Sequence, residues 1–321
     1  MTISNHARYA TRLNAFKTKG SSVADMIAGA GRVGGLNAAD LNYPDHFEAH
    51  TPQQLGGMLA DQGMALNGLA MRYYTESGFK LGAFTHPDAA MRRAAIDLTK
   101  RGIDTCAEMG ADLMTLWMGQ DGYDYAFQGD YARMWDDTIA ALIEVAEHNP
   151  AVNIAVEYKP DEPRAFALMP DMATTLLALR DVGCANTGVT LDFAHVLYAG
   201  EMPAFVAMLA HRHSRILGVH LNDGYGKRDD GLMAGTVHPV QTVELFVGLA
   251  RAGYDGVIYF DTFPDHAGLD PVAEARANIR LVTRLRAVAD GLAGNADLAA
   301  AMARQDAAAT SLIVAQALYG A

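Results

Sequence analysis

The stretch that decides the fold runs from Val152 to Asp192 and reads VNIAVEYKPDEPRAFALMPDMATTLLALRDVGCANTGVTLD. An apolar run ends in Glu157, a helical pattern over 170–182 ends at Gly183, and a second apolar run ends in Asp192. A strand, a helix and a second strand in succession predict two parallel strands joined by a crossover helix. The glycine after the helical pattern is typical of a helix end in the left-handed conformation.

The same alternation fills most of the chain. Further strands are predicted at 38–43, 64–73, 111–117, 216–221 and 256–261, with a weaker one near 8–16. Further helices are predicted at 88–108, 133–148, 202–211 and 242–252, and Gly110 and Gly253 follow two of them. Eight such units favour a closed (β/α)₈ TIM barrel over an open sheet. We expect one α/β barrel domain over residues 1–286.

The alternation stops after Arg286. Residues 287–321 are alanine-rich, have helical propensity and contain no strand pattern. Their apolar side chains, among them Leu298, Leu312 and Leu318, need a surface to cover them. We expect a C-terminal helical extension that docks on another copy of the chain, in a homodimer or homotetramer. The alternative is that it docks on the outer ring of its own barrel.

The charge of the chain excludes several partners. It carries 37 acidic and 25 basic residues, a net charge of −12, which suits neither nucleic acid nor an anionic membrane surface. No run of about 18 apolar residues and no signal-peptide pattern occurs, so we expect no membrane span. Two cysteines, Cys106 and Cys184, are too few for a zinc ribbon or a disulfide scaffold. We therefore expect a cytoplasmic protein.

One glycine-rich segment, GAGRVGG at 29–35, has the spacing of a dinucleotide-binding loop. It follows no clear strand, and no acidic residue stands where a ribose would need one. We interpret these glycines as turn residues at a helix end.

Charged side chains stand at the ends of four successive predicted strands: Glu157, Asp192, His220 and Asp261. In a barrel the carboxyl ends of all strands converge on one face, where active sites lie. Three carboxylates meeting there without a cation would repel one another. With one imidazole they form a ligand set for Mn²⁺, Mg²⁺ or Co²⁺.

A second group stands beside the first. His195 follows Asp192 by three residues, and Asp229 and Asp230 lie in the loop after His220. These residues are candidates for a second metal site that shares Asp192. The alternative is that the two aspartates belong to a solvated turn.

Several segments resemble the xylose isomerases. EYKPDEPR at 157–164 resembles the family motif EPKPNEPR, and GADLMTLWMGQDG at 110–122 resembles GA-x(5)-WGGREG. FKLGAF with MRRAA, HLNDGYGKRDDGLMAG and FDTFP resemble further family segments. The resemblance runs from about residue 64 to 266, which is most of the expected barrel.

That resemblance implies an aldose–ketose isomerase that moves a hydride between C1 and C2 of an open-chain sugar. It implies that Glu157, Asp192, His220 and Asp261 hold one metal, and that Asp192, His195 and Asp229 hold another. Lys159 matches the lysine that contacts the carbonyl oxygen, and Trp117 matches the tryptophan that walls the sugar pocket. A lysine two residues after Glu157 lies on the same side of the strand, where its ammonium can stabilise an oxyanion.

The sequence also departs from the family pattern. His220 stands where the family has an aspartate, Asp192 replaces a glutamate, and Gly231 replaces an aspartate, so that Asp230 is a candidate substitute. Asn42 stands near the position of the ring-opening histidine, and His46 is a candidate for that role. A ligand set of glutamate, aspartate, histidine and an acidic fourth residue resembles L-rhamnose isomerases and ketose 3-epimerases. Another small sugar is therefore expected in place of D-xylose.

Three other functions stay open at this point. A ketose 3-epimerase would use Glu157 and Asp261 on opposite faces of C3 for proton transfer. An endonuclease of the same barrel superfamily would need a basic groove, which the charge does not favour. A sugar-binding barrel without catalysis is the third. Aromatic side chains that can line the pocket are Tyr73, Tyr74, Phe79, Tyr123 and Tyr125.

Overall fold

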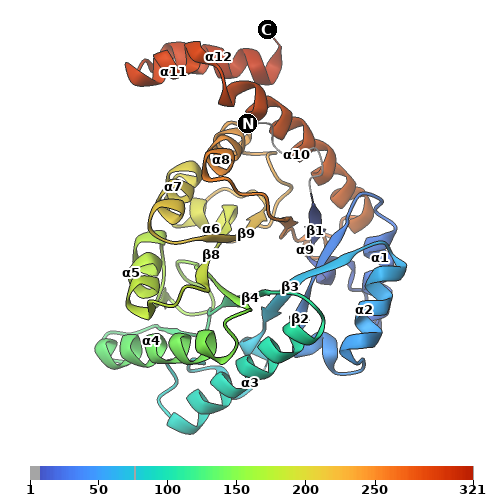
Figure 1. The fold of residues 1–321 in the computed structure, drawn as a ribbon, viewed down its shortest axis with the longest axis vertical. Coiled ribbons are helices and arrows are strands. Elements are labelled where there is room, and N and C mark those ends of the chain that lie inside the picture. Colours follow the sequence, from blue (N-terminus) through green and yellow to red (C-terminus); the bar gives the residue numbers. More distant parts are fainter. Residues whose placement is uncertain (1–7, 76, 321) are drawn as a thin grey trace.

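Eight parallel strands surrounded by helices form the body of the computed structural model, which describes residues 8–75 and 77–320 (Figure 1). The strands are β1 (Tyr9–Thr11), β2 (Ala38–Tyr43), β3 (Ala65–Met71), β4 (Leu113–Trp117), β6 (Asn153–Glu157), β8 (Thr187–Asp192), β9 (Ile216–Leu221) and β10 (Ile258–Phe260). Their order in the sheet is β1-β10-β9-β8-β6-β4-β3-β2, and each of these neighbouring pairs is parallel.

The two ends of this sheet meet at Asn37. Its backbone N–H donates to the carbonyl oxygen of Tyr9 at 3.0 Å, and its Oδ1 accepts from the N–H of Tyr9 at 2.8 Å. This contact brings β1 beside the start of β2 and almost closes the barrel. The predicted (β/α)₈ barrel is confirmed.

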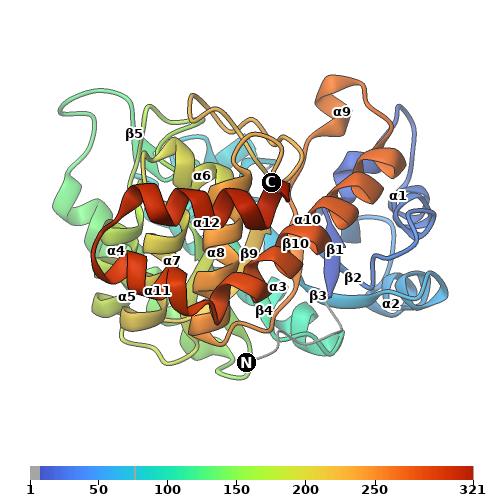
Figure 2. The same cartoon turned by 90° about the horizontal axis from the view of Figure 1, so that it is seen from above.

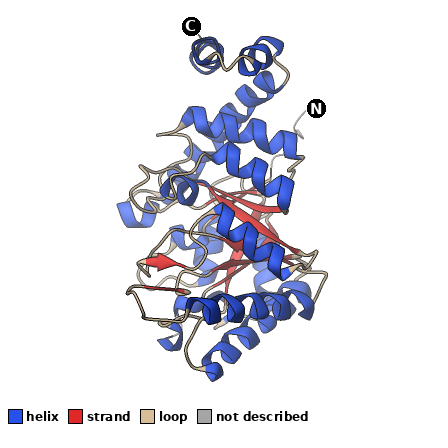
Figure 3. Ribbon diagram, turned by 90° about the vertical axis from the view of Figure 1, so that its left-hand side faces the viewer, coloured by secondary structure: helices blue, strands red, loops and turns tan. Residues whose placement is uncertain are grey.

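Longer helices cover the outside of the barrel (Figure 3), in chain order around it (Figure 1). They are α1 (Val23–Gly31), α2 (Pro52–Asp61), α3 (Ala89–Glu108), α4 (Tyr131–His148), α5 (Met172–Val182), α7 (Pro203–His213), α8 (Pro239–Ala252) and α10 (Pro271–Ala293). Two short helices, α6 (Phe193–Tyr198) and α9 (Pro264–Ala267), follow β8 and β10 closely. A short hairpin of β5 (Gly122–Tyr123) and β7 (Phe166–Ala167) lies outside the barrel sheet. None of the described helices combines the length and apolar character that a membrane crossing requires.

Helix ends follow the signals in the sequence. Aspartates before α3, α4 and α5 accept hydrogen bonds from backbone N–H groups of the first turn. Gly110, Gly183 and Gly253 have φ of +76°, +67° and +71°, the left-handed conformation expected after a helix. The glycines of the 29–35 segment lie at the end of α1 and in the turn after it, which confirms their interpretation as helix-end residues.

The terminal strands differ from the prediction in extent. The weak strand predicted near 8–16 is limited to β1, because Leu13–Phe16 turns into a short 3₁₀ helix. Strand β10 ends at Phe260, so Asp261 follows the strand directly. The seven N-terminal residues, over which no signal peptide is expected, lie outside the described residues.

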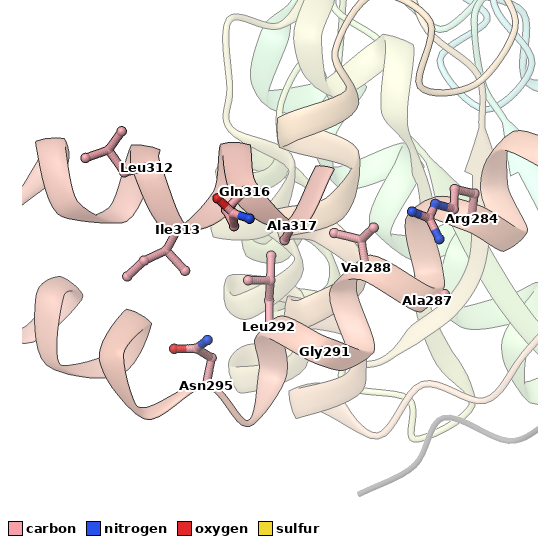
Figure 4. Close-up of a pocket in the computed structure, with 10 residues that line it drawn as sticks. All are labelled: Arg284, Ala287, Val288, Gly291, Leu292, Asn295, Leu312, Ile313, Gln316 and Ala317. Atoms are coloured by element: carbon pink, nitrogen blue, oxygen red, sulfur yellow. The ribbon is translucent and has the colours of Figure 1, made fainter. Parts of the chain in front are cut away.

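The C-terminal extension projects from the barrel (Figures 1 and 2). Helix α10 continues through residue 286 to Ala293, and α11 (Ala296–Ala303) and α12 (Ala307–Tyr319) follow it. A cleft of about 640 Å³ lies between α10 and α12. Ile313 and Leu292 point toward one another across it (Figure 4), yet none of the described side chains of α12 is fully buried.

Candidate metal centre and sugar pocket

The carboxyl ends of the strands form one mouth of the barrel. The loops that carry β5 and α9 leave from this mouth and lie on one side of the molecule, the upper side in Figure 2. Around the mouth, in spatial order, the strand ends present Asp261, Arg12, Asn42, Arg72, Trp117, Glu157, Asp192 and His220. Residues that are far apart in the sequence therefore share one rim.

Four of these side chains come together. Glu157, Asp192, His220 and Asp261 each offer one ligand atom, and the four atoms lie within 4.8 Å of one another. Nδ1 of His220 lies 3.1 Å from Oε1 of Glu157. Glu157, Asp192 and His220 are buried, and Asp261 is partly buried. The four residues predicted from the strand ends thus form one compact oxygen and nitrogen cluster.

The electrostatics of this cluster favour a bound cation. Burial disfavours charged His220, yet the carboxylates of Glu157, Asp261 and Asp192 raise its pKa to about 10. Burial and the neighbouring carboxylates of Asp229, Glu157 and Asp261 raise the pKa of Asp192 to about 7, although His195 opposes the shift. The raised pKa values mean that His220 and Asp192 tend to bind protons, which offset the negative charge of the neighbouring carboxylates. A divalent ion would displace these protons, because metal ligands bind in their deprotonated forms.

His195, Asp229 and Lys159 form a second group beside the cluster. Nε2 of His195 lies 3.2 Å from Oδ2 of Asp229, and Nζ of Lys159 lies 3.3 Å from the same oxygen. Nδ1 of His195 lies 3.7 Å from Oε1 of Glu157 and 4.0 Å from Oδ1 of Asp192. Within the described part of the chain, His195 Nδ1 and Asp229 Oδ1 are buried without a hydrogen-bond partner. Both atoms are suited to bind a cation.

Lys159 and Asp229 form an ion pair within this second group. Burial disfavours charged Lys159, but Asp229 and Glu162 raise its pKa, so that the side chain is an ammonium ion at neutral pH. Burial acts against the Asp229 carboxylate, yet hydrogen bonding and charge from His195 and Lys159 lower its pKa to about 2. Asp229 therefore stays ionised.

Asp230 lies apart from both groups. Its Oδ2 accepts from the N–H of Tyr225 at 2.8 Å, and its Oδ1 accepts from Nε of Arg228 at 2.8 Å. The loop thus engages this carboxylate within itself. Of the two adjacent aspartates, the structure brings Asp229 to the site and leaves Asp230 in its own loop.

Asn222 is a site residue that the sequence analysis missed. Its Nδ2 lies 3.3 and 3.2 Å from the two carboxylate oxygens of Asp192 and 3.1 Å from the carbonyl oxygen of Asp261. Its Oδ1 accepts from the N–H of Ala194 at 2.8 Å. This fully buried amide fixes the orientation of one ligand and the backbone of another. Its position directly after β9 was the available signal.

Trp117, at the end of β4, lies next to Glu157 at the rim of the barrel. The ring of Tyr74 packs edge-on against it at 5.4 Å, and Lys159 Nζ lies 5.3 Å from its ring centroid. The indole Nε1 is buried and has no hydrogen-bond acceptor among the described residues. Of the five aromatic candidates, Tyr74 lies here, Tyr73 and Phe79 pack in the core, Tyr123 packs against Tyr131 and Phe166, and Tyr125 is 74% exposed.

Asn42 and His46 lie together at the end of β2. The N–H of Asn42 donates to Nδ1 of His46 at 3.1 Å, and Nε2 of His46 lies 3.1 Å from Oδ1 of Asn14. Burial, Arg72 and Lys17 lower the pKa of His46 to about 4. His46 is therefore a neutral ring whose two nitrogens already have partners, and it connects the ends of β1 and β2.

The chain is a (β/α)₈ barrel that carries, at the carboxyl ends of its strands, four side chains that could hold a metal ion. The family model described as a xylose isomerase-like TIM barrel matches residues 28–285. The chain belongs to this family.

One sequence relative agrees with that assignment, and two solved structures share the fold. Xylose isomerase from Thermus thermophilus is 26% identical over 209 residues, 63% of this chain and 54% of that protein. This chain thus spans just over half the length of that relative. A xylose isomerase domain protein from Alicyclobacillus acidocaldarius superposes with a TM-score of 0.67 at 19% identity, covering 88% of this chain and 99% of the other. An L-ribulose 3-epimerase superposes with a TM-score of 0.69 at 17% identity, covering 89% and 97%.

Proposed function

We propose that this protein is a divalent-metal-dependent aldose–ketose isomerase. It would interconvert a small open-chain sugar that has its carbonyl at C1 with the isomer that has its carbonyl at C2. The observation that carries the proposal is the four-residue cluster with Lys159 and Trp117 beside it. The similarity to xylose isomerase over 209 residues supports the same reaction class. The substrate we expect is a pentose, a deoxy sugar or a branched sugar.

Glu157, Asp192, His220 and Asp261 would hold one Mn²⁺, Mg²⁺ or Co²⁺ ion, and Asp192, His195 and Asp229 would hold a second. The buried, unpartnered atoms of His195 and Asp229 support the second site. When bound, a divalent ion supplies Lewis acidity to the carbonyl and neighbouring hydroxyl oxygens of a sugar.

The chain's own side chains would perform the remaining tasks. The Lys159 ammonium is held by Asp229 and Glu162, at 3.3 and 2.9 Å, and would stabilise negative charge that develops on the carbonyl oxygen. Trp117 and Tyr74 would exclude water from one face of the sugar, which protects hydride transfer between C1 and C2. Asn42 and His195 would contact sugar hydroxyls, and His46, whose ring nitrogens already contact Asn42 and Asn14, would position Asn42.

A ketose 3-epimerase is the second candidate. Its support is the presence of Glu157 and Asp261 in one cluster, where two carboxylates can act on a single carbon, together with the similarity of fold to L-ribulose 3-epimerase. Lys159 favours the isomerase, because proton transfer at C3 requires only the two carboxylates and the metal.

Proton NMR in D₂O distinguishes the two reactions. A panel of aldoses and ketoses is incubated with EDTA-treated protein and then with added Mn²⁺, Mg²⁺ or Co²⁺. We expect metal-dependent aldose–ketose interconversion with negligible deuterium incorporation. Deuterium at C3 of the recovered ketose would contradict the isomerase and support the epimerase. Absence of turnover in wild type with every metal would leave only sugar binding. Unchanged turnover in both Glu157→Gln and Lys159→Ala would show that the proposed site does not carry the reaction.

We also propose that the C-terminal extension joins copies of the chain in the cytoplasm as a homodimer or homotetramer. Support comes from α12, which carries no charged residue and leaves Leu312 73% exposed. Light scattering of the full chain and of a chain ending at Gly294 tests this. We expect particles of the truncated protein to contain fewer copies of the chain than particles of the full-length protein. A monomeric full chain would contradict the proposal.

A further inference from the structure

A small cavity borders Trp117. The other residues that line it come from the segment after β4, which includes Asp121, from the end of β6 and from β7 with the two residues after it. Its volume is about 10 Å³. A volume of roughly 10–15 Å³ is the least that holds one water molecule. The cavity therefore admits a single water and nothing larger.

Trp117 contributes a buried donor to this place. Its indole Nε1 forms no hydrogen bond with any residue that the structure describes. The ring itself is held, because Tyr74 packs edge-on against it at 5.4 Å and Gly119 leaves no room for a side chain beside its six-membered part. An indole N–H can only donate, so it needs an acceptor that can reach it.

Asp121 contributes a buried acceptor. Its side chain is 1% exposed, and its Oδ1 accepts from the N–H groups of Ala83 and Thr85 at 3.1 and 2.6 Å and from Oγ1 of Thr85 at 2.7 Å. Burial raises the pKa of Asp121 to about 6, and these hydrogen bonds oppose the shift, so the carboxyl is mainly ionised at neutral pH. Oδ2, in contrast, is buried and has no partner in the described part of the chain.

The two unpaired atoms are complementary. Nε1 of Trp117 can only donate, an ionised Oδ2 of Asp121 can only accept, and they do not bond to one another. Lys159 also borders the cavity, but its ammonium already pairs with Asp229 and Glu162. A cation could not accept from the indole, and a halide could not donate to the carboxylate. A water molecule does both.

We propose that one water molecule in this cavity bridges Nε1 of Trp117 and Oδ2 of Asp121. Asp121 is then a positioning residue, because it connects the backbone of residues 83–85 through the water to the indole. The water site stands without the proposed function. Its consequence for a sugar, which is a fixed pocket wall at Trp117, rests on that function.

A high-resolution crystal structure of the full chain tests the site directly. We expect a density peak about 2.7–3.2 Å from both Nε1 of Trp117 and Oδ2 of Asp121, the range of ordinary hydrogen bonds. The peak should persist in crystals soaked with xylitol, an unreactive polyol. Absence of the peak, or a xylitol hydroxyl on Nε1 in its place, would overturn the inference.

Indole ¹⁵N–¹H NMR tests the bridge in solution, and the chain supplies its own reference. It contains two tryptophans, and Nε1 of Trp135 donates to Oδ2 of Asp181 at 3.2 Å. Trp135→Phe assigns the two indole signals. We expect Asp121→Asn to move the Trp117 indole proton upfield, because a neutral amide polarises the bridging water less than a carboxylate does. The Trp135 signal should stay in place.

Thr85→Val is the matched control for this substitution. It removes the Oγ1 donor to Oδ1 of Asp121 and keeps the carboxylate that faces the water. It should move the Trp117 signal much less than Asp121→Asn does. An unmoved Trp117 signal in Asp121→Asn, or equal movement in both variants, would overturn the bridge. The density test on wild type holds even if a variant folds poorly.

Failure of this inference and failure of the proposed function have different signatures, because neither measurement involves turnover. A metal-dependent sugar isomerase without the bridging water would contradict the water site alone. A bridged indole in a protein that turns over no sugar with any metal would contradict the proposed function alone.

Discussion

Nδ1 of His220 lies 3.1 Å from Oε1 of Glu157, although β8 separates the two strands that carry them. Both side chains point into the mouth of the barrel, where Asp192 and Asp261 complete a cluster of ligand atoms within 4.8 Å. Such a contact between a buried imidazole and a buried carboxylate marks the centre of the proposed metal site.

Asp229→Asn and Asp230→Asn form a matched pair of neighbouring substitutions. Asp229 contacts His195 and Lys159, so its replacement should lower kcat/KM about 10- to 100-fold and weaken the second of two Mn²⁺ binding events. Asp230 is engaged within its loop, so its replacement should change either quantity less than about twofold. Mn²⁺ titration calorimetry and steady-state kinetics measure both. A larger loss in Asp230→Asn would reverse the assignment.

Lys159→Met removes the proposed oxyanion partner without removing a metal ligand. We expect kcat to fall about 100-fold or more while Mn²⁺ affinity changes little. Lys100→Met is the control, because Lys100 pairs with Glu144 on the outer helices and should leave kcat unchanged. Retention of wild-type kcat in Lys159→Met would argue against a role for the ammonium and favour the epimerase.

Asn222→Ala removes the amide that holds Asp192. We expect Mn²⁺ affinity to fall about 10- to 100-fold, because orienting groups around a metal tune its ligands. Asn186→Ala is the comparison, since Asn186 donates to the backbone carbonyls of Ala146 and Val152 at the other end of the barrel. That variant should lose stability without losing Mn²⁺ affinity. Equal Mn²⁺ affinity in both variants would contradict the role of Asn222.

His46 makes stability depend on pH. Its pKa is lowered from 6.5 to about 4 in the folded chain, so between these values the unfolded chain binds the extra proton. The free energy of unfolding should therefore fall as the pH drops from about 6.5 to about 4, by on the order of 3 kcal/mol from this group.

Urea unfolding in EDTA across this pH range measures the effect. His46→Gln should flatten the dependence, whereas His211→Gln, at an exposed position on α7, should keep the wild-type slope. Parallel pH dependences for wild type and His46→Gln would contradict this account of the buried ring.

Much of the barrel could be predicted because apolar runs alternate with helical patterns, and the four cluster residues could be predicted because parallel strands bring their carboxyl ends together. Short strands were harder to predict from the sequence. Strand β1 has three residues, and the strand predicted at 64–73 placed Arg72 inside it instead of after it. For that reason neither Arg12 nor Arg72 was recognised as a rim residue.

The conformation of the loop after β9 could not be predicted from the sequence either. Sequence cannot distinguish Asp229 from its neighbour Asp230, because loop conformation decides which one faces the site. Here buried Asp223 fixes the loop, accepting hydrogen bonds from the N–H groups of Gly224, Val237 and His238. Continuity of α10 through residue 286 is likewise a property of packing that the end of the strand pattern does not reveal.

The most direct test of the central claim is anomalous diffraction at the manganese edge from crystals grown with Mn²⁺. We expect an anomalous peak within about 2–2.5 Å of ligand atoms from Glu157, Asp192, His220 and Asp261. The peak should disappear in Asp192→Asn. Absence of a peak at this cluster in wild type, or a peak held by other residues only, would contradict the assignment of these four side chains as the metal centre.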